Sequence, residues 1–403
     1  MNTFGIYDQR HLSEVTIERF KAAFKPGPIP MQSFNVVIGA NGSGKSTLIE
    51  ALQWLDNTIR RDARDASDRY FGVHDLINLR SRTDVPYFQM KLVWASDNDS
   101  PAVRYRLKVE EQDGNPYVAE EELVSLSDRG RTASTFIETR SRGERLVCSM
   151  EGPQEHFPFQ EPDRLALIWA TSSDSSVRRA AIGFLSSFWS HAVFLRLSPA
   201  RLAQGSPAKK RSFEPLLDEE GQNLPALLNE LTPEQKRELV LNVREILPGI
   251  RDVEVLKTEL GRDTRVNYSL LERMPYRGRA GRYQFAIPAW MLSEGTRRIT
   301  AILALLAHEP APSLLCIEEI ENGLDPQTVI RILQHLQSAA DRGTQVVLTT
   351  HSPWLLDHVP MESILRVRRV DGDTKYEQFS SLPAIEAYDS SVPAGTRYVN
   401  EVD

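Results

Sequence analysis

The sequence predicts an α/β protein that also contains a large antiparallel β segment. An apolar run at residues 34–38 enters a glycine-rich loop, and the residues after that loop place their apolar side chains on one helical face. Residues 85–150 instead alternate apolar and polar side chains, as expected of antiparallel strands with one buried face. From residue 292 onward helical and strand-like stretches alternate, which predicts parallel βα units.

Composition sets the broad class of protein. At roughly 150 residues per domain, a chain of 403 residues is expected to form two to three domains. Its 48 basic and 55 acidic residues give a net charge of −7, so the surface as a whole is not built to coat nucleic acid. The longest apolar stretch, residues 299–306, is far shorter than the ~18 residues that a membrane span needs. Two cysteines form no disulfide framework. We therefore expect a soluble cytoplasmic protein with no membrane partner.

Shifts in pattern divide the chain into four expected parts. The α/β core lobe is expected at residues 1–58 and 286–370, and the antiparallel β meander at residues 59–160. Residues 161–285 predict a mainly helical insertion with short strands near 253–256 and 283–287, and residues 371–403 a C-terminal tail.

The glycine-rich loop carries the strongest chemical signal. Residues 39–46 read Gly-Ala-Asn-Gly-Ser-Gly-Lys-Ser, which matches the P-loop pattern G-x-x-x-x-G-K-[ST] at every position. Glycines let successive main-chain N–H groups converge on a polyphosphate at the positive end of the following helix. Lys45 is expected to reach the β- and γ-phosphates and the Ser46 hydroxyl to ligate Mg²⁺. The residues expected to contact ATP here are Gly39, Asn41, Gly42, Ser43, Gly44, Lys45, Ser46 and Thr47.

A second predicted strand, at residues 314–317, is followed by the carboxylates that a P-loop site needs. Residues 314–317 are apolar and end in Glu318 and Glu319, where ligands bind in open α/β sheets. Because adjacent side chains on a strand point to opposite faces, the two carboxylates are expected to have different tasks. We assign Glu318 to the Mg²⁺ shell and Glu319 to the attacking water. The competing interpretation is an acidic helix N-terminus after a core strand.

Three further motifs follow in order. Residues 292–296 (Leu-Ser-Glu-Gly-Thr) precede the acidic strand, residues 323–326 (Gly-Leu-Asp-Pro) follow it, and a strand at residues 346–350 runs into His351. With the P-loop and the acidic strand, this series resembles the ABC-type ATPase heads of transporters, chromosome-maintenance proteins and RecF-like repair proteins. By this resemblance, residues 292–296 are a degenerate signature motif, residues 323–326 are a D-loop and His351 is a switch histidine. It implies a P-loop NTPase fold with the meander and the helical insertion.

The residues within these motifs resemble one branch of these proteins in particular. Residues 317–324, 349–353 and 15–20 are similar to the stand-alone AAA family ATPases related to RecF and to the ATPase part of OLD (overcoming lysogenisation defect) nucleases, often found in antiphage defence. Glu318 departs from the aspartate of most ABC proteins. Glu294-Gly295-Thr296 replaces the transporter-like Gly-Gly-Gln, which argues against a transporter subunit. No toprim-like acidic cluster follows residue 353, so no nuclease domain is expected.

The resemblance implies a mechanism that needs two copies of the chain. ATP and Mg²⁺ held by one copy would be covered by Ser293 and Gly295 of another, while His351 senses the γ-phosphate and Asp325 communicates across the interface. ATP-dependent formation of a homodimer or higher oligomer would then act as a switch. The catalytic residues implied are Glu319, Lys45 and His351. The expected function is antiphage defence or DNA repair with a separately encoded effector such as a nuclease.

Other functions stay open. An autonomous DNA-binding, RecF-like repair ATPase would use arginine clusters, for which a solvated surface is the competing interpretation. Gln89 is either a Q-loop ligand of Mg²⁺ or a polar residue of a strand. A small-molecule kinase would leave residues 293–296 and His351 without a task. A transporter subunit would need a coupling surface for a membrane partner, and the sequence reveals none. DNA, RNA and protein are all compatible triggers. The clusters comprise Arg129, Arg131, Arg140, Arg142 and Arg145; Arg201, Lys209, Lys210 and Arg211; and Arg273, Arg277, Arg279 and Arg282.

Overall fold

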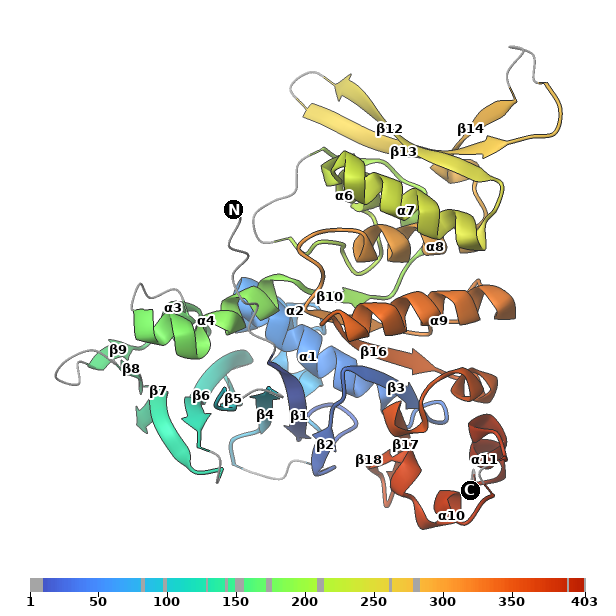
Figure 1. Cartoon of the computed structure of the whole chain (residues 1–403). Coiled ribbons are helices and arrows are strands. Elements are labelled where there is room, and N and C mark those ends of the chain that lie inside the picture. Colours follow the sequence, from blue (N-terminus) through green and yellow to red (C-terminus); the bar gives the residue numbers. More distant parts are fainter. Residues whose placement is uncertain are drawn as a thin grey trace. The chain divides into compact units, whose positions relative to one another are not determined.

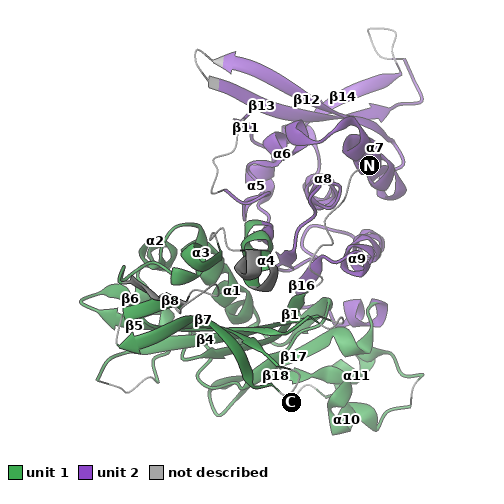
Figure 2. Cartoon of the chain, turned by 60° about the vertical axis from the view of Figure 1, so that its left-hand side comes forward, with its two compact units in different colours: residues 1–190, 359–403 green, residues 191–358 purple. Residues whose placement is uncertain are grey.

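The computed structural model divides into two compact units. Unit 1 comprises Met1–Ser190 and Val359–Asp403, and unit 2 comprises His191–His358 (Figure 2). The residues that the structure describes are 10–80, 84–96, 100–127, 130–141, 144–148, 156–171, 176–208, 214–260, 263–277, 283–389 and 391–401.

Unit 1 contains the antiparallel β segment that the alternating pattern predicted. Eight strands form one sheet in the order β2-β1-β4-β5-β6-β7-β8-β9, and every neighbouring pair is antiparallel. In β4 each second residue is buried, so one face of the sheet forms the core. The strands are β1 His11–Glu18, β2 Pro28–Pro30, β4 Tyr87–Ala95, β5 Val103–Gln112, β6 Asn115–Leu126, β7 Thr132–Ser141, β8 Glu144–Cys148 and β9 His156–Phe159.

The strand–loop–helix unit of the P-loop lies in the same unit. Strand β3 (Phe34–Ile38) is buried along its whole length and leads into α1 (Lys45–Arg60). Strand β17 (Ile364–Val370) pairs parallel with β3, and β18 (Asp373–Gln378) pairs antiparallel with β17. Trp54 of α1 stacks edge-on against Phe88 of β4 at 5.0 Å between ring centroids, which joins α1 to the antiparallel sheet.

Shorter elements complete unit 1. Residues 371–403, for which the sequence predicted a tail, contain β18, a 3₁₀ turn and two short helices. The helices and 3₁₀ turns are α2 Ala63–Asp68, η1 Val73–Leu76, α3 Ala166–Thr171, α4 Ser176–Ser190, η4 Met361–Ser363, η5 Phe379–Ser381, α10 Pro383–Glu386 and α11 Ala394–Asn400.

A buried ion pair lies inside the antiparallel sheet region. Arg145 and Glu121 are both fully buried, with Arg145 Nη1 3.0 Å from Glu121 Oε2. The Glu121 carboxylate also accepts hydrogen bonds from Tyr105 Oη (3.1 Å) and from the main-chain N–H groups of Ala166 and Leu167 (2.8 Å each). Arg145 was counted in an arginine cluster open to nucleic acid, and that assignment is wrong because its side chain is fully buried and its Nη1 and Nη2 atoms donate to protein acceptors.

Removing one partner of this pair should be costly. We expect Arg145→Met to lower the free energy of unfolding by about 3–5 kcal/mol, because Glu121 would keep a buried charge without its counter-ion. Arg140→Met is the matched control, since Arg140 is exposed and 3.9 Å from Glu138, and such pairs contribute about 0–1 kcal/mol. Urea unfolding curves measure both variants. Equal unfolding midpoints for the two would contradict the prediction.

Unit 2 begins with a parallel sheet, as the βα alternation predicted. Strands β10 (Ala192–Leu195), β15 (Leu314–Ile317) and β16 (Gln345–Thr350) lie in the order β10-β15-β16 and pair parallel. All residues of the three strands are buried, which is typical of parallel strands covered on both faces. Helices α8 (Glu294–Leu306) and α9 (Pro326–Asp341) precede β15 and β16.

A second sheet in unit 2 is larger than the sequence predicted. The insertion was expected to be mainly helical with short strands, but β12 (Ile250–Leu260) and β13 (Asp263–Arg273) have 11 residues each and pair along almost their whole length. Helices α6 (Leu224–Glu230) and α7 (Pro233–Ile246) cover one face of this sheet (Figure 1). In β13, Val266, Tyr268 and Leu270 are buried and alternate with polar residues, so the period-two signal was present in the sequence.

The remaining elements of unit 2 are short. They are α5 Pro199–Leu202, β11 Ser206–Pro207, β14 Gln284–Pro288, η2 Ala289–Met291 and η3 Pro353–His358. In the part of the chain that the structure describes, no helix has the length and apolar character needed to cross a membrane.

Candidate functional site

The P-loop lies between β3 and α1 of unit 1, where its sequence context predicted it. Gly44 is the residue before α1 and has a φ of 108°, and Gly42 has a φ of 73°, both in the region that favours glycine. A Cβ atom at Gly39 would lie 2.1 Å from the carbonyl oxygen of Val367, so no other residue fits there. The loop therefore has the tight turns and the close main-chain approach that a phosphate cradle requires.

Lys45 occupies the centre of this loop. Its side chain is buried, and Nζ lies 2.7 Å from Gly39 O and 3.0 Å from Ala40 O. These two carbonyls hold the ammonium group at the N-terminus of α1, where the helix dipole also favours an anion. The other predicted contacts lie on the same turn: Asn41 is exposed, Ser46 is half-buried and Thr47 is buried. A polyphosphate fits this donor set.

The two predicted carboxylates lie at the end of β15 in unit 2. The N–H of Glu318 donates to Leu195 O at 2.9 Å and so continues the ladder from β10. Glu319 has a φ of 50°, in the left-handed region that non-glycine residues rarely adopt, and its N–H donates to Thr349 Oγ1 at 2.9 Å. The strand ends at Ile317, so strand alternation does not govern how the Glu319 side chain points, and that part of the sequence argument was wrong.

The Glu319 carboxylate is held by two neighbours. One oxygen lies 3.6 Å from His351 Nε2, and the other accepts a hydrogen bond from the Asn322 side-chain amide. The structure thus brings together two predicted catalytic residues, Glu319 and His351. Asn322 and Glu321 were quoted as motif residues without a task. Glu321 accepts from Thr350 Oγ1 at 2.9 Å and from the His351 N–H at 2.7 Å, which positions the histidine segment.

The signature-like segment and the D-loop-like segment touch each other in unit 2. Ser293 caps α8, with its Oγ accepting from the Thr296 N–H at 3.1 Å. A Cβ atom at Gly295 would lie 2.7 Å from Gly323 O, and one at Gly323 would lie 2.8 Å from the Glu294 carboxylate. The glycines therefore permit this close approach. A displacement of one segment would therefore shift the other through this contact.

Asp325 performs a structural task on α9. Its carboxylate accepts from the Thr328 N–H at 3.1 Å and from Thr328 Oγ1 at 2.6 Å, and these bonds hold the pKa of Asp325 below its usual value. Asp325 is exposed beyond this cap. Nearby, Arg298 lies 3.4 Å from Glu294 and within electrostatic reach of Glu319, although burial lowers the pKa of its guanidinium. Helix α8 therefore carries a positive charge within electrostatic reach of Glu319.

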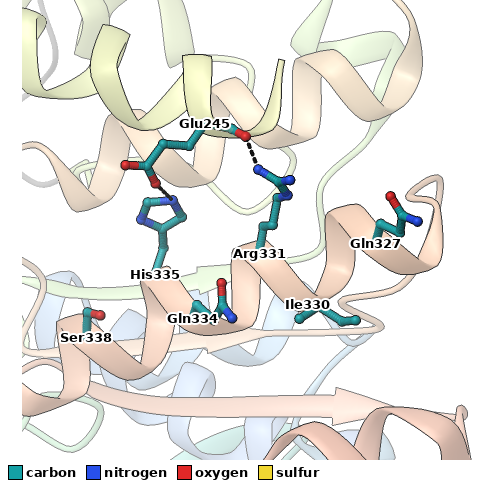
Figure 3. Close-up of a pocket in the computed structure, with 7 residues that line it drawn as sticks. All are labelled: Glu245, Gln327, Ile330, Arg331, Gln334, His335 and Ser338. Carbon is teal, nitrogen blue, oxygen red and sulfur yellow. Dashed lines mark hydrogen bonds and ion pairs between the residues drawn. The ribbon is translucent and has the colours of Figure 1, made fainter. Parts of the chain in front are cut away.

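A cavity of about 490 Å³ lies elsewhere in unit 2, along α9 and the end of α7. Figure 3 shows His335 of α9 meeting the Glu245 side chain, at 3.3 Å from Nε2 to Oε2, and Arg331 donating to the Glu245 carbonyl. None of the predicted site residues lines this cavity. The lining residues are Glu245, Gln327, Ile330, Arg331, Gln334, His335 and Ser338.

His335 predicts a pH effect on stability. Burial lowers the pKa of His335 below its usual 6.5, with Arg342 acting in the same direction and Glu245 opposing. The unfolded chain therefore binds this proton more readily, and the free energy of unfolding falls as pH drops through 6.5. We expect His335→Gln to show a smaller loss of melting temperature than the wild type between pH 7.5 and 6. Parallel losses would contradict the prediction. His74→Gln, at an exposed histidine, is the control.

Gln89 and the arginine clusters were the weaker candidates from the sequence. Gln89 lies within β4, and its amide lies 2.5 Å from Glu18 on β1, as expected of a polar strand residue. Arg201 pairs with Glu220 at 3.2 Å. Arg131, Arg273 and Arg277 are exposed. The cluster members that fall outside the described residues are Arg129, Arg142, Lys209, Lys210, Arg211, Arg279 and Arg282.

The two predicted Mg²⁺ ligands belong to different units, Ser46 to unit 1 and Glu318 to unit 2. Among the described residues, no group of three or more His, Cys, Asp or Glu side chains is arranged to hold a metal ion. A hydroxyl and a carboxylate are the oxygen donors that Mg²⁺ prefers next to phosphates.

Solved structures share this fold. Two SMC head structures match with a TM-score of 0.55: one bound to the C-terminal winged-helix domain of ScpA (15% identity, 91% of this chain and 97% of that chain), and one with an extended coiled coil bound to a ScpA C-terminal domain from Pyrococcus furiosus (14%, 91% and 96%). At these identities the likeness shows the fold alone, which is that of ABC-type P-loop NTPase heads.

Sequence comparison gives the family. The energy-coupling factor transporter ATP-binding protein EcfA2 of Lactococcus lactis subsp. cremoris (strain MG1363) is 29% identical over 116 residues, 28% of this chain. The chain spans 38% of the length of that relative. A family model described as "AAA domain, putative AbiEii toxin, Type IV TA system" matches residues 34–357, which include the P-loop, Glu318, Glu319 and His351. With most of its length matched, the chain belongs to this family of AAA domains, on an ABC-type ATPase fold.

Proposed function

We propose that this protein binds and hydrolyses ATP and uses ATP-dependent dimerisation as a switch, in antiphage defence or DNA repair, with a separately encoded effector such as a nuclease. The observation that carries the proposal is the P-loop: glycines at the positions where a Cβ would clash, and Lys45 held at the helix N-terminus. The family adds support, because the motifs that follow the P-loop lie within the matched residues.

The proposed chemistry assigns each residue one task. Main-chain N–H groups of residues 39–47 and the Lys45 ammonium bind the phosphates and orient the γ-phosphoryl group. Glu319 orients the attacking water and accepts its proton, because its carboxylate is held by Asn322 and faces His351. Ser46 and Glu318 would hold Mg²⁺, which would neutralise charge on the phosphates.

A second copy of the chain completes the proposed site. Ser293 and the following turn of α8 offer a hydroxyl and a helix N-terminus, which suit a γ-phosphate. That turn contacts the D-loop-like segment where Gly295 lies close to Gly323, and Asp325 at the start of α9 follows directly. Binding of phosphate at the turn would therefore shift the D-loop-like segment. Loss of the γ-phosphate would remove the shared ligand and loosen the dimer.

Dimerisation by ATP is the test of this proposal. We expect Glu319→Gln to elute as a monomer without nucleotide and as a dimer or larger assembly with Mg-ATP in light scattering after size exclusion. Ser293→Ala in the same background should weaken that assembly. A protein that hydrolyses ATP at full rate as a strict monomer would contradict the switch. Neighbouring gene products in a pull-down would identify the effector.

A second candidate function is direct contact with single-stranded nucleic acid. At the β13–β14 end of unit 2, Tyr276 and Tyr283 are 60% and 47% exposed, and the Arg277 guanidinium lies 5.3 Å above the Tyr283 ring. Tyr276 stands against Phe285 at 5.8 Å between centroids. Exposed rings beside arginines can stack bases and bind phosphates.

Oligonucleotide binding distinguishes this function from a protein-triggered switch. We expect salt-dependent binding of a labelled single strand, weakened about tenfold or more by Tyr276→Ala with Arg277→Ala, since stacking contributes about 1–3 kcal/mol per base. Arg237→Ala, at an exposed arginine of α7, is the control. ATP turnover that single- and double-stranded DNA leave unchanged would favour a protein trigger.

A further inference from the structure

Two hydroxyl groups near the C-terminus bond to the main chain of the P-loop. Thr374 Oγ1 lies 3.1 Å from Ser43 O, and the Tyr376 hydroxyl lies 2.8 Å from Gly44 O, although these partners are 331 and 332 residues apart in the sequence. Both side chains belong to β18 and are buried, so water competes little for the two bonds. Burial also raises the pKa of Tyr376, which keeps its hydroxyl protonated as a donor.

The β17–β18 hairpin also fits the loop sterically. The Val367 carbonyl of β17 occupies the space next to Gly39, and the Thr374 side chain occupies the space next to Gly44, where a Cβ would lie 2.5 Å from Oγ1. The glycines of the motif are thus required by the hairpin as well as by phosphate. A loop that moved away from β18 would lose these contacts.

Strand β18 is itself fixed to the segment after β1. The buried Asp373 carboxylate accepts hydrogen bonds from the N–H groups of Phe24 (2.8 Å), Lys25 (2.9 Å) and Thr374 (2.8 Å). Thr374 Oγ1 also lies 3.2 Å from Ala22 O, so its single proton is shared between Ala22 and Ser43. The donors that reach the P-loop therefore come from a strand that is itself hydrogen-bonded to residues 22–25.

The loop carbonyls are held by two sets of donors. Gly39 O and Ala40 O accept from Lys45, whereas Ser43 O and Gly44 O accept from β18. If Lys45 turns to a bound phosphate it releases its two carbonyls, and the β18 bonds remain. Because each carbonyl points opposite to the N–H of the same peptide plane, bonds that fix these carbonyls also fix neighbouring N–H groups.

We propose that Thr374 and Tyr376 are positioning residues that hold the P-loop in its phosphate-binding conformation, so that the C-terminal hairpin sets the affinity for nucleotide. The inference rests on the proposed ATP binding at residues 39–47. A preformed loop has less conformational freedom to lose when the ligand binds, and its affinity is higher for that reason.

Calorimetric titration of the full chain with Mg-ADP tests the inference. We expect Tyr376→Phe and Thr374→Val each to raise Kd about 3- to 10-fold, the range of one net hydrogen bond. KM for ATP should rise in parallel while kcat stays within about twofold, because these hydroxyls do not touch the reacting atoms. Tyr398→Phe is the matched control, since Tyr398 lies in α11 and the same hydroxyl is removed.

The outcomes separate three cases. A raised Kd in Tyr376→Phe and Thr374→Val, with Tyr398→Phe unchanged, supports the inference. Wild-type affinity in both variants, whether or not their melting temperature without nucleotide falls, overturns the inference and leaves the proposed function standing. A wild-type protein that binds no Mg-ADP overturns the proposed function and the inference together.

Discussion

Lys45→Ala is expected to reduce ATP turnover to background and to raise the Kd for ATP at least about tenfold. The ammonium is the one side-chain cation at the start of α1 in the described loop, and hydrogen bonds between charged groups contribute about 1.5–3 kcal/mol each. Without the Lys45 ammonium, the charge that develops in the transition state is also less stabilised, so turnover falls by more than the loss of ATP binding alone. Calorimetric titration with ATP and a phosphate-release assay measure the two effects separately.

A surface lysine provides the control for this variant. Lys91 of β4 pairs with Glu14 at 2.7 Å on the partly exposed strand surface, so Lys91→Ala should change stability and turnover little. The removal of Lys45 also deprives Gly39 O of a donor, so the melting temperature of each variant should be recorded. Wild-type turnover by Lys45→Ala would refute the P-loop assignment.

Glu319→Gln is expected to retain ATP while slowing hydrolysis by about 10²–10⁴-fold. The substitution keeps the shape of the side chain and removes the group that accepts the proton of water. Because ATP then persists, the closed dimer should accumulate. Single-turnover kinetics with radiolabelled ATP measure the chemical step, and light scattering measures the assembly.

The two carboxylates can be told apart by parallel substitution. Glu318→Gln should weaken the Mg²⁺ dependence of nucleotide binding and leave less ATP bound. If Glu318→Gln traps the dimer and Glu319→Gln does not, the two assigned tasks are exchanged. Glu138→Gln in β7, on an exposed strand surface, controls for the loss of one negative charge.

Asn322 offers a finer check on the same carboxylate. Its amide donates to Glu319, and Asn322→Asp would replace that donor with a like charge. The repelled carboxylate should orient the attacking water less well, so kcat should fall while KM stays unchanged. Wild-type kcat in Asn322→Asp would show that the Asn322 amide does not position Glu319 for catalysis.

Local patterns were enough to predict the elements that carry the motifs. The bounds of β3 and β15 agree with the apolar runs at residues 34–38 and 314–317, because buried parallel strands read as continuous apolar stretches. The glycine pattern before Lys45 predicted the turn and the start of α1, because it encodes main-chain conformations that few other residues adopt. These signals act within a few residues, so the sequence displays them directly.

Contacts between distant segments were beyond the reach of such patterns. The burial of Arg145 against Glu121, the left-handed φ of Glu319 and the bonds from β18 to the P-loop depend on which segments the folded chain brings together. Residues 371–403 look polar and irregular along the sequence, yet Thr374 and Tyr376 reach the main chain of residues 43 and 44. Spacing along a chain describes one element at a time, whereas hydrogen bonds between elements follow from how those elements pack. For that reason the sequence was enough to predict the P-loop, and only the fold revealed the hydrogen bonds from β18 that hold it.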